Sequence, residues 1–376
     1  MSKVKFGDIV KDVKINVDRD NNPYEFYVAG DHMDSEDLNI RRRGRFATDD
    51  VGPAFTRIFK KGQVLYGSRR TYLKKVAVAD FDGICANTTF VFESKDPAAF
   101  EQRLLPFLML SEGFTNWSIA HSKGSTNPYV LFSDLASYEF DLPSLAEQKV
   151  LAEKLWAAYE VKQSYLKMIE ATQEMVKSQF IEMFGGGNWP QKTLGEVGSF
   201  TRGGGFQKSD FVEHGIPCIH YGQIHTKFGP FITSHITEIS SDLESKTKFA
   251  SKGDLVIAIT SEDTEGSCKS TAWLGDYSVA VGGHAAIYKH SMNPLYMSFF
   301  FKSTLFNHAK IEYVHGTKVF EIKPDDIAKI LVPYPPMSLQ NQFSAIAEQA
   351  DKSVFELRKS VDAIDKVIKS LINENL

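Results

Sequence analysis

The most regular hydrophobic pattern of the chain runs from residue 343 to residue 371. Apolar residues recur there at alternating intervals of four and three, and charged residues fill the positions between them. The apolar positions are Phe343, Ala347, Ala350, Val354, Leu357, Val361, Ile364, Ile368 and Leu371. Such a pattern over about four heptads predicts a coiled-coil helix, and so narrow a seam needs a partner helix.

A second segment of the same chain carries a matching seam and is the predicted partner. Its positions are Leu155, Tyr159, Lys162, Leu166, Ile169, Gln173, Val176, Phe180 and Met183. Lys162 and Gln173 interrupt the apolar run, and polar residues at such positions commonly fix register and orientation at some cost in stability. The alternative is that each helix covers its own domain separately.

The regions around the two helices form an internal repeat at an offset of roughly 190 residues. The matched segments are Phe6–Ile9 with Leu194–Val197, Lys61–Leu65 with Lys252–Val256, Asp134–Ala136 with Asp326–Ala328, Pro143–Gln148 with Pro336–Gln342, and Val176–Ser178 with Ile368–Ser370. The order is domain, helix, domain, helix. The predicted segments are 1–143, 144–186, 187–336 and 337–376.

Each domain is predicted to combine short strands with a few helices. Gly, Asn, Asp and Pro turns separate the strands, which are expected at 24–29, 63–66, 76–79, 88–92, 216–219, 254–260 and 285–289. Helical stretches are expected near 98–112 and 295–310, and Ser144 with Glu147 predicts a capping box at the first long helix. The predicted fold class is α/β: two similar mixed α/β domains, joined by two long antiparallel helices that form a coiled coil with a pseudo-twofold repeat.

This geometry favours a long, repeating ligand. A helix of about 38 residues spans roughly 55–60 Å, and duplex DNA presents equivalent major-groove faces about 34 Å apart. The net charge of −4 weighs against a globally basic domain, since each of the four segments has one more acidic than basic residue. DNA contact must therefore come from local clusters of charge.

Composition places the chain among ordinary globular proteins, with 43% hydrophobic and 24% charged residues. No apolar run approaches the length of a membrane span, and the first residues contain no apolar signal region. Cys85, Cys218 and Cys268 are scattered without a CxxC motif, so neither a disulfide framework nor a zinc site is predicted. A cytoplasmic, reduced protein is expected.

Taken together, the pattern resembles the specificity subunits of type I restriction–modification systems. The motifs that carry the resemblance are Leu142–Gln148 with its second copy Pro335–Gln342, Lys61–Leu73, and Gly124-Ser125-Thr126 before Asp134-Leu135, echoed by Gly316-Thr317-Lys318 before Asp326-Ile327. Their order and duplication cover essentially the whole chain. The second copy departs by having Gln340-Asn341 in place of Ala146-Glu147, and its 261–270 loop lacks an Arg-Arg pair.

The resemblance implies a division of labour within a larger complex. Each target-recognition domain is expected to read one half of a bipartite sequence in double-stranded DNA, while the helices set the gap and dock two methyltransferase subunits. Two motor-nuclease (restriction) subunits join where the system has them. The subunit itself is expected to be non-catalytic and to hold no cofactor or metal. Adenine methylation with S-adenosylmethionine belongs to the partner, and ATP with Mg²⁺ belongs to the motor subunit.

Candidate DNA contacts in the first domain fall in three basic or polar stretches. Arg can bond the guanine edge bidentately, whereas contacts to phosphate supply affinity with little sequence information. The candidates are Arg41, Arg42, Arg43 and Arg45 for phosphate, Ser68, Arg69, Arg70, Thr71, Tyr72 and Lys74 for bases, and Lys123, Ser125, Thr126 and Asn127 in a polar loop. The plainer alternatives are solvated turns and connectors.

Candidates in the second domain occupy the repeated positions. Arg202 precedes three glycines that allow close approach to phosphate or simply form a flexible turn, and Gln suits an adenine edge. The candidates are Arg202, Tyr221, Gln223, His225, Lys269, His315, Thr317 and Lys318.

Metal and catalytic interpretations are disfavoured. His220, His225 and His284 have no accompanying set of carboxylates or thiols. The sequence contains neither a strand–GxGxxG–helix unit nor a phosphate-binding GxxxxGK[ST] loop. Two rival hypotheses remain: a methyltransferase or nuclease with divergent motifs, and a protein-interaction scaffold that does not bind DNA.

Overall fold

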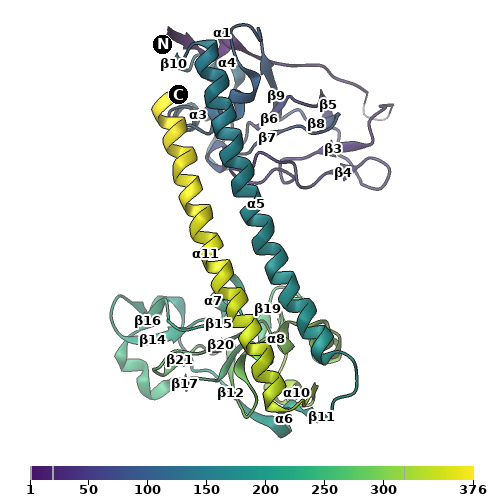
Figure 1. The fold of residues 1–376 in the computed structure, drawn as a ribbon, viewed down its shortest axis with the longest axis vertical. Helices are drawn as coiled ribbons and strands as arrows, with labels where there is room; N and C mark the ends of the chain where they lie inside the picture. Colours follow the sequence, from purple (N-terminus) through teal and green to yellow (C-terminus); the bar gives the residue numbers. More distant parts are fainter. Residues whose placement is uncertain (1, 19–20, 317) are drawn as a thin grey trace. The chain divides into compact units, whose positions relative to one another are not determined.

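The computed structural model describes residues 2–18, 21–316 and 318–376. Its residues form two compact units, Met1–Leu166 with Lys359–Leu376, and Lys167–Arg358. Each unit holds one mixed α/β domain together with parts of both long helices, α5 (Leu145–Phe184) and α11 (Met337–Asn375) (Figure 1). This grouping follows packing, whereas the four predicted segments divide the chain in sequence order.

The first domain contains two four-stranded sheets and a two-stranded ribbon. The ribbon pairs β1 (Ser2–Lys5) with β10 (Glu139–Leu142). One sheet has the order β2 (Val10–Asp12), β9 (Thr89–Ser94), β6 (Val64–Gly67), β7 (Val76–Val78). The other has the order β4 (Gly44–Arg45), β3 (Phe26–Val28), β8 (Gly83–Ala86), β5 (Phe55–Phe59), with β3 and β8 parallel. Helical segments are α1 (Phe6–Ile9), η1 (Thr71–Leu73), η2 (Gln102–Leu104), α2 (Leu105–Leu110), α3 (Glu112–Ala120) and α4 (Phe132–Ala136).

The second domain repeats this plan with longer sheets. Its ribbon pairs β11 (Gln191–Thr193) with β24 (Leu331–Pro333). One sheet has the order β12 (Gly198–Arg202), β22 (Ala285–His290), β18 (Leu255–Ala258), β20 (Ser270–Trp273), β15 (Phe231–Ile232). The other has the order β13 (Phe211–Val212), β16 (Thr237–Ile239), β14 (Ile216–Ile219), β21 (Val279–Val281), β17 (Lys248–Ala250), with β14 and β21 parallel. A short pair joins β19 (Thr260–Ser261) to β23 (Phe320–Glu321). Helical segments are α6 (Leu194–Val197), η3 (Lys208–Asp210), α7 (Tyr221–Thr226), η4 (Ser241–Lys246), α8 (Pro294–Lys302), α9 (Thr304–Lys310), η5 (Ile311–Tyr313) and α10 (Pro324–Ile327).

The predicted strands and helices lie close to those observed. The expected strand at 216–219 coincides with β14, and those at 24–29 and 254–260 shorten to β3 and β18. The helix expected at 295–310 is two helices, α8 and α9, because Ser303 accepts a hydrogen bond from the Phe306 N–H and starts a new helix. Helix α2 begins later than residue 98, after a 3₁₀ turn.

The two long helices run antiparallel in each unit. In the first unit, Leu151 and Leu155 of α5 share a core with Ile368 and Ile372 of α11. In the second unit, the ring centroids of Phe180 and Phe343 lie 5.2 Å apart, so the end of α5 meets the start of α11. The predicted fold class is therefore confirmed: two mixed α/β domains repeat, and two long helices pair in opposite directions within each unit.

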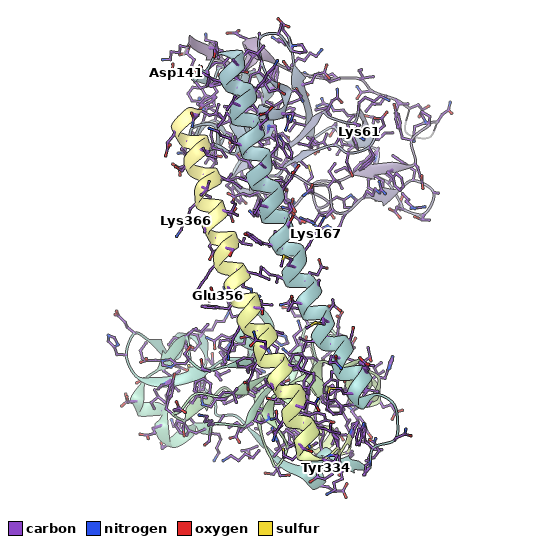
Figure 2. All side chains as sticks on the ribbon, viewed as in Figure 1. Lys61, Asp141, Lys167, Tyr334, Glu356 and Lys366 are labelled. Carbon is purple, nitrogen blue, oxygen red and sulfur yellow. The ribbon has the colours of Figure 1, made fainter. Side chains whose placement is uncertain are left out.

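Burial along the seam is uneven. Phe343, Ala347, Ala350 and Val354 are buried at one end and Ile368 at the other, whereas Leu357, Val361 and Ile364 are half-buried. Flanking positions such as Glu356 and Lys366 are exposed (Figure 2). The two polar residues that interrupt the seam of α5 have different surroundings. Lys162 forms a 2.6 Å ion pair with Asp365, whereas Gln173 is exposed.

The start of each long helix is anchored by one buried glutamine. The Gln148 amide donates to the Pro143 carbonyl (2.9 Å) and accepts from the Glu101 N–H (2.9 Å). Gln340 donates to the Pro335 carbonyl (2.8 Å) and accepts from the Asn293 N–H (2.9 Å). The repeat offset here is therefore 340 less 148, or 192 residues.

This equivalence corrects one sequence match. The prediction that Pro143–Gln148 corresponds to Pro336–Gln342 is displaced by one residue at its start and by two at its end, because the shared hydrogen bond of a buried glutamine to a proline carbonyl pairs Pro143 with Pro335 and Gln148 with Gln340. With this alignment Gln340 matches Gln148, so Gln340 is no longer a departure of the second copy from the first. The capping box predicted at Ser144 is confirmed, since the Ser144 N–H donates to the Glu147 carboxylate over 2.8 Å and the Glu147 N–H donates back to Ser144 Oγ over 3.4 Å.

We predict that Gln148→Met lowers the free energy of unfolding of the first unit by about 2–4 kcal/mol. The substitution keeps the volume but leaves buried backbone groups at Glu101 and Pro143 without partners. Chemical denaturation followed by circular dichroism measures the change. The exposed Gln349, changed to Met in the same way, is the matched control and should shift the free energy by less than about 0.5 kcal/mol.

Candidate nucleic-acid interface

Two predicted DNA-contact loops of the first domain lie side by side. Arg69 and Tyr129 form an isolated β-bridge, the Arg70 N–H donates to the Pro128 carbonyl (2.7 Å), and the Val130 N–H donates to the Ser68 carbonyl (2.9 Å). These bonds join the loop that follows β6 to the turn between α3 and α4. Stretches that are far apart in sequence thus form one polar surface.

The backbone of this surface adopts unusual conformations. Arg70, Lys74 and Glu36 have φ values of +50°, +48° and +55°, a left-handed region that non-glycine residues seldom enter. The Glu36 N–H donates to the Lys74 carbonyl (3.1 Å), and their side chains form a 2.8 Å ion pair that lowers the pKa of Glu36. Strained residues of this kind cluster at binding sites, where the surrounding structure holds them in place.

The candidate side chains of these loops divide by burial. Ser68 and Thr71 are buried and hold the loop, with Ser68 Oγ donating to the Thr88 carbonyl (2.5 Å). Lys123 is tied to Asp134 (3.0 Å) and Lys74 to Glu36. Those that remain exposed and available to a ligand are Arg69, Arg70, Tyr72, Ser125, Thr126 and Asn127.

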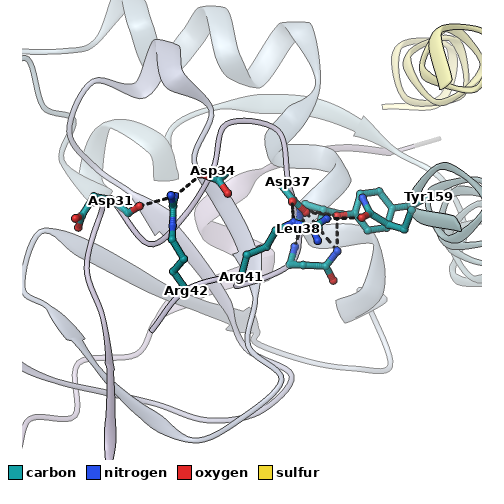
Figure 3. Close-up of polar contacts among 9 residues, drawn as sticks. Asp31, Asp34, Asp37, Leu38, Arg41, Arg42 and Tyr159 are labelled. Carbon is teal, nitrogen blue, oxygen red and sulfur yellow. Dashed lines mark hydrogen bonds and ion pairs between the residues drawn. The ribbon is translucent and has the colours of Figure 1, made fainter. Parts of the chain in front are cut away.

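The cluster of four arginines is exposed but bonded within the first unit. Arg41 donates to Asp37 and Gln163, and Arg42 donates to Asp34 and the Asp31 carbonyl (Figure 3). The guanidinium of Arg43 stacks 4.0 Å from the Phe26 ring centroid, and Arg45 forms a 3.0 Å ion pair with Glu25. Contact with phosphate by these side chains would have to compete with those partners.

Arg41 belongs to a network that joins the first domain to α5. The Tyr159 hydroxyl donates to Asp37 (2.5 Å) and accepts from the Leu38 N–H (2.9 Å) (Figure 3). Burial raises the pKa of Asp37, but hydrogen bonds from Tyr159, the Asn39 N–H and Arg41 outweigh it and hold that pKa below its ordinary value. The loop around Asp37 is thereby fixed against the helix.

The second domain repeats the joined loops. β19 pairs with β23, and His315 bridges Glu321 with N–H to carbonyl distances of 3.0 and 2.8 Å. Lys123 bridges Tyr129 in the same way in the first domain, at 2.7 and 2.9 Å. The glycine after each bridging residue has positive φ, +86° at Gly124 and +134° at Gly316, where a side chain would be strained.

The candidates of the second domain are arranged as follows. His315 and Lys318 are exposed at this turn, Lys269 is exposed elsewhere, beside Lys302 and Lys310, and Thr317 lies outside the described residues. Arg202 is exposed and binds the Gly283 carbonyl (2.9 Å) and Glu321 (3.3 Å).

The α7 candidates are less accessible. Gln223 is buried, and its amide is occupied by the His220 N–H and Thr237 Oγ1, both at 2.8 Å. His225 contacts the Thr260 carbonyl over 3.0 Å, and Tyr221 is half-buried. This arrangement favours a structural role for Gln223, while its contact with DNA stays a prediction.

The side chains that could ligate a metal ion are dispersed in the described part of the chain. Among those residues no group of three His, Cys, Asp or Glu side chains could hold a metal ion. The three cysteines are buried, and burial raises the pKa of the Cys85 and Cys268 thiols to about 12, which keeps them protonated. No helix of the described residues is long and apolar enough to cross a membrane.

The sequence missed Tyr129 and the pairing of the loops. Tyr129 is 41% exposed beside Arg69, although only polar residues of its loop were predicted as contacts. The sequence signal was the aromatic residue directly after the polar turn. The pairing has no local signal, because its bonds join residues about 60 positions apart.

Comparison with known proteins relates the first part of the chain to a family. Residues 4–169 match the family described as "Type I restriction modification DNA specificity domain". The chain is 28% identical over 133 residues to the EcoDI specificity subunit of Escherichia coli, covering 35% of this chain and 29% of that protein, so the match spans less than a third of it. It is 21% identical over 314 residues to the MjaVIII specificity subunit of Methanocaldococcus jannaschii, covering 77% and 73%.

Solved structures share the fold along the whole chain. One comes from work on complex assembly and conformational transition of a type I restriction–modification system, with a TM-score of 0.59 at 20% identity over 100% of this chain and 98% of the other. The S subunit from M. genitalium gives 0.51 at 14% identity over 100% and 96%. The repeated mixed α/β domains and the two long helices of this chain are the fold that these structures share. The resemblance to specificity subunits of type I restriction–modification systems that the sequence predicts is confirmed over residues 4–169 by the family model, and both curated relatives are such subunits.

We predict that Tyr159→Phe destabilises the first unit by about 1–3 kcal/mol, because the Leu38 N–H and Asp37 lose a buried partner. The pKa of Asp37 is lowered on folding, so its contribution is present above its unfolded pKa and is lost as pH falls through the folded value. Denaturation at pH 7 and below pH 4 should therefore show the difference from wild type shrinking in acid. An unchanged difference would exclude Asp37 as the partner that matters.

Proposed function

We propose that this chain reads a bipartite DNA sequence, with each domain contacting one half of the target. The observation that carries the proposal is the duplicated surface: in both domains a loop after a buried strand is bonded to a turn with a left-handed glycine. Exposed Arg69, Arg70 and Tyr72 supply the first domain with guanine-edge and stacking contacts. His315 and Lys318 lie on the equivalent turn of the second domain, and Lys269 is a further exposed cation of that domain.

The long helices set the gap between half-sites and dock two methyltransferase subunits, joined by two motor-nuclease subunits where the system has them. Support comes from apolar side chains that the chain leaves uncovered on α5, including Met168 and Met175, both 52% exposed. In the second unit a groove of about 620 Å³ lies between the helices, lined by Thr172, Met175, Ala345, Ile346 and Ser353 among others. Small side chains there leave room for a partner helix.

Catalysis belongs to the partners in this proposal. The chain itself holds no cofactor. The methyltransferase subunit uses S-adenosylmethionine to methylate a flipped adenine. The motor subunit uses ATP with Mg²⁺. The complex works in the cytoplasm, where its DNA substrate lies.

Footprinting of the reconstituted complex tests this function against the scaffold alternative. Two protected blocks separated by a constant gap support DNA reading, whereas a scaffold gives no sequence-dependent protection. Incubating the purified chain alone with DNA and labelled S-adenosylmethionine tests the catalytic alternative, since incorporation of methyl groups would require an active site in this chain. Methylation-sensitive sequencing of the host genome then gives both half-sites.

We predict that replacing Arg69 and Arg70 together with Ala relaxes specificity in one half-site only. If each bonds a guanine edge, discrimination there falls by about 1–3 kcal/mol per contact, while the other half-site keeps its selectivity. Selection from duplexes randomised in either half, bound by the reconstituted complex and sequenced, measures the change.

The paired control is Lys61→Ala combined with Lys95→Ala, which removes the same charge from the first domain away from the two loops. A uniform loss of affinity for all sequences in the arginine variant would mean that these side chains contact phosphate and not bases.

A further inference from the structure

Both units contain the same cleft, bordered by the domain and by the two long helices. Matching residues at an offset of 192 line it in each copy. In the first unit they include Phe107, Ile368 and Lys369, and in the second unit their counterparts are Phe299, Val176 and Lys177. The clefts therefore share an apolar floor and one lysine from a long helix.

The two copies differ in how far the chain itself fills them. The first cleft has a volume of about 100 Å³, and the second about 600 Å³. The first is closed by the loop that carries Glu36, Asp37 and Leu38, with Leu38 only 1% exposed. In the second, the 225–231 segment borders the cleft without closing it.

The chemistry of the loop that closes the first cleft is acidic and apolar. Glu36 forms an ion pair with Lys74 and lies in the field of Lys369 and Lys162, while Asp37 bonds Tyr159 and Arg41. Leu38 packs in the core that includes the floor residue Phe107. Within the first cleft, Glu36 thus compensates Lys74, Asp365 compensates Lys162, and Leu38 covers the apolar floor.

The second cleft has cations without an equivalent acidic loop. At the repeat offset of 192 residues, Lys302 of the second unit corresponds to Leu110 of the first unit, and Asp351 corresponds to Tyr159. Within the described residues, no hydrogen-bond or ion-pair acceptor is found for the Lys302 ammonium. Burial, with Lys177 and Lys269 nearby, lowers the pKa of Lys302 to about 8, which marks a cation short of compensating charge.

Further groups around this cleft leave an excess of positive charge. Lys227 and Arg358 are exposed at its edge, and Asp351 is the carboxylate among its lining residues. Burial raises the pKa of Asp351, which Arg358 partly offsets. Lys177 is bonded to Glu174 (2.6 Å) beside the cleft.

We propose that the second cleft binds an acidic segment of a partner subunit, in which an apolar residue follows adjacent carboxylates as Leu38 follows Glu36 and Asp37. The occupied first cleft shows the chemistry that fits this floor, and the charge excess of the second complements it. A DNA phosphate would satisfy the cations but leave Val176, Phe299 and Val354 without an apolar partner. The proposal rests on the proposed function for the partner's identity, the methyltransferase subunit of the same system.

Charge reversal in the cleft provides the binding test. Lys302→Glu should raise the Kd of the full chain for the methyltransferase subunit at least tenfold, and Lys302→Met should raise it less, because Met keeps the aliphatic packing. Lys248→Glu, an exposed site on β17 with the same change of charge, is the matched control and should leave the Kd within twofold. Thermal unfolding of each variant shows that the fold is retained.

Carbodiimide coupling, which joins an ammonium to a contacting carboxylate, tests the chemistry of the segment. Mass spectrometry of the coupled wild-type complex should show Lys302 or Lys227 joined to an Asp or Glu beside an apolar residue of the partner. Coupling confined to lysines outside the cleft would overturn the proposal. The proposal is also overturned if the Lys302→Glu variant assembles with the partner as well as the wild type does. If the wild type itself fails to assemble or to bind DNA, the proposed function is overturned instead.

The DNA alternative has its own readout. If Lys302→Glu leaves assembly unchanged but reduces the slope of log affinity against log salt for DNA by about 1, the occupant is a backbone phosphate and the proposal is wrong. The salt slope is measured on the assembled complex at saturating partner concentration.

Discussion

The constraint on which the structure depends is that neither long helix can cover its own apolar face. A seam of two positions per heptad is too narrow for burial against a domain alone and too apolar to remain in water. Each unit resolves this by combining the start of one helix with the end of the other on a single core, Leu151 with Ile372 and Phe343 with Phe180. Each unit therefore combines one domain with the start of one long helix and the end of the other.

The same exchange explains why the loops can be specific. The loop after β6 and the turn after α3 are bonded to each other, and these bonds hold strained residues such as Arg70 in place. Recognition residues held on a rigid framework lose little conformational entropy when a ligand binds. The framework recurs in both domains, while the side chains on it differ, which is the arrangement expected where two half-sites have different sequences.

Periodicity and repetition in the sequence were enough to predict the fold. The seams at 155–183 and 343–371, the capping box at Ser144 and the matched Gly7 and Gly195 regions are local or periodic signals. The bonded partners of the candidate side chains were not predictable, because Asp37 with Tyr159 and Arg70 with Pro128 join distant segments. The misplaced match at Gln342 arose for the same reason, since only the buried amide bonds identify Gln340.

The sharing of helix ends also has a consequence for the order of folding. The core of the first domain contains Ile368 and Ile372, which leave the ribosome more than 220 residues after β10, the last strand of that domain. During synthesis this domain therefore exposes an apolar surface until the last helix arrives, a state prone to association with other chains. A nascent subunit would gain from a chaperone, or from a partner that covers the surface before translation is complete.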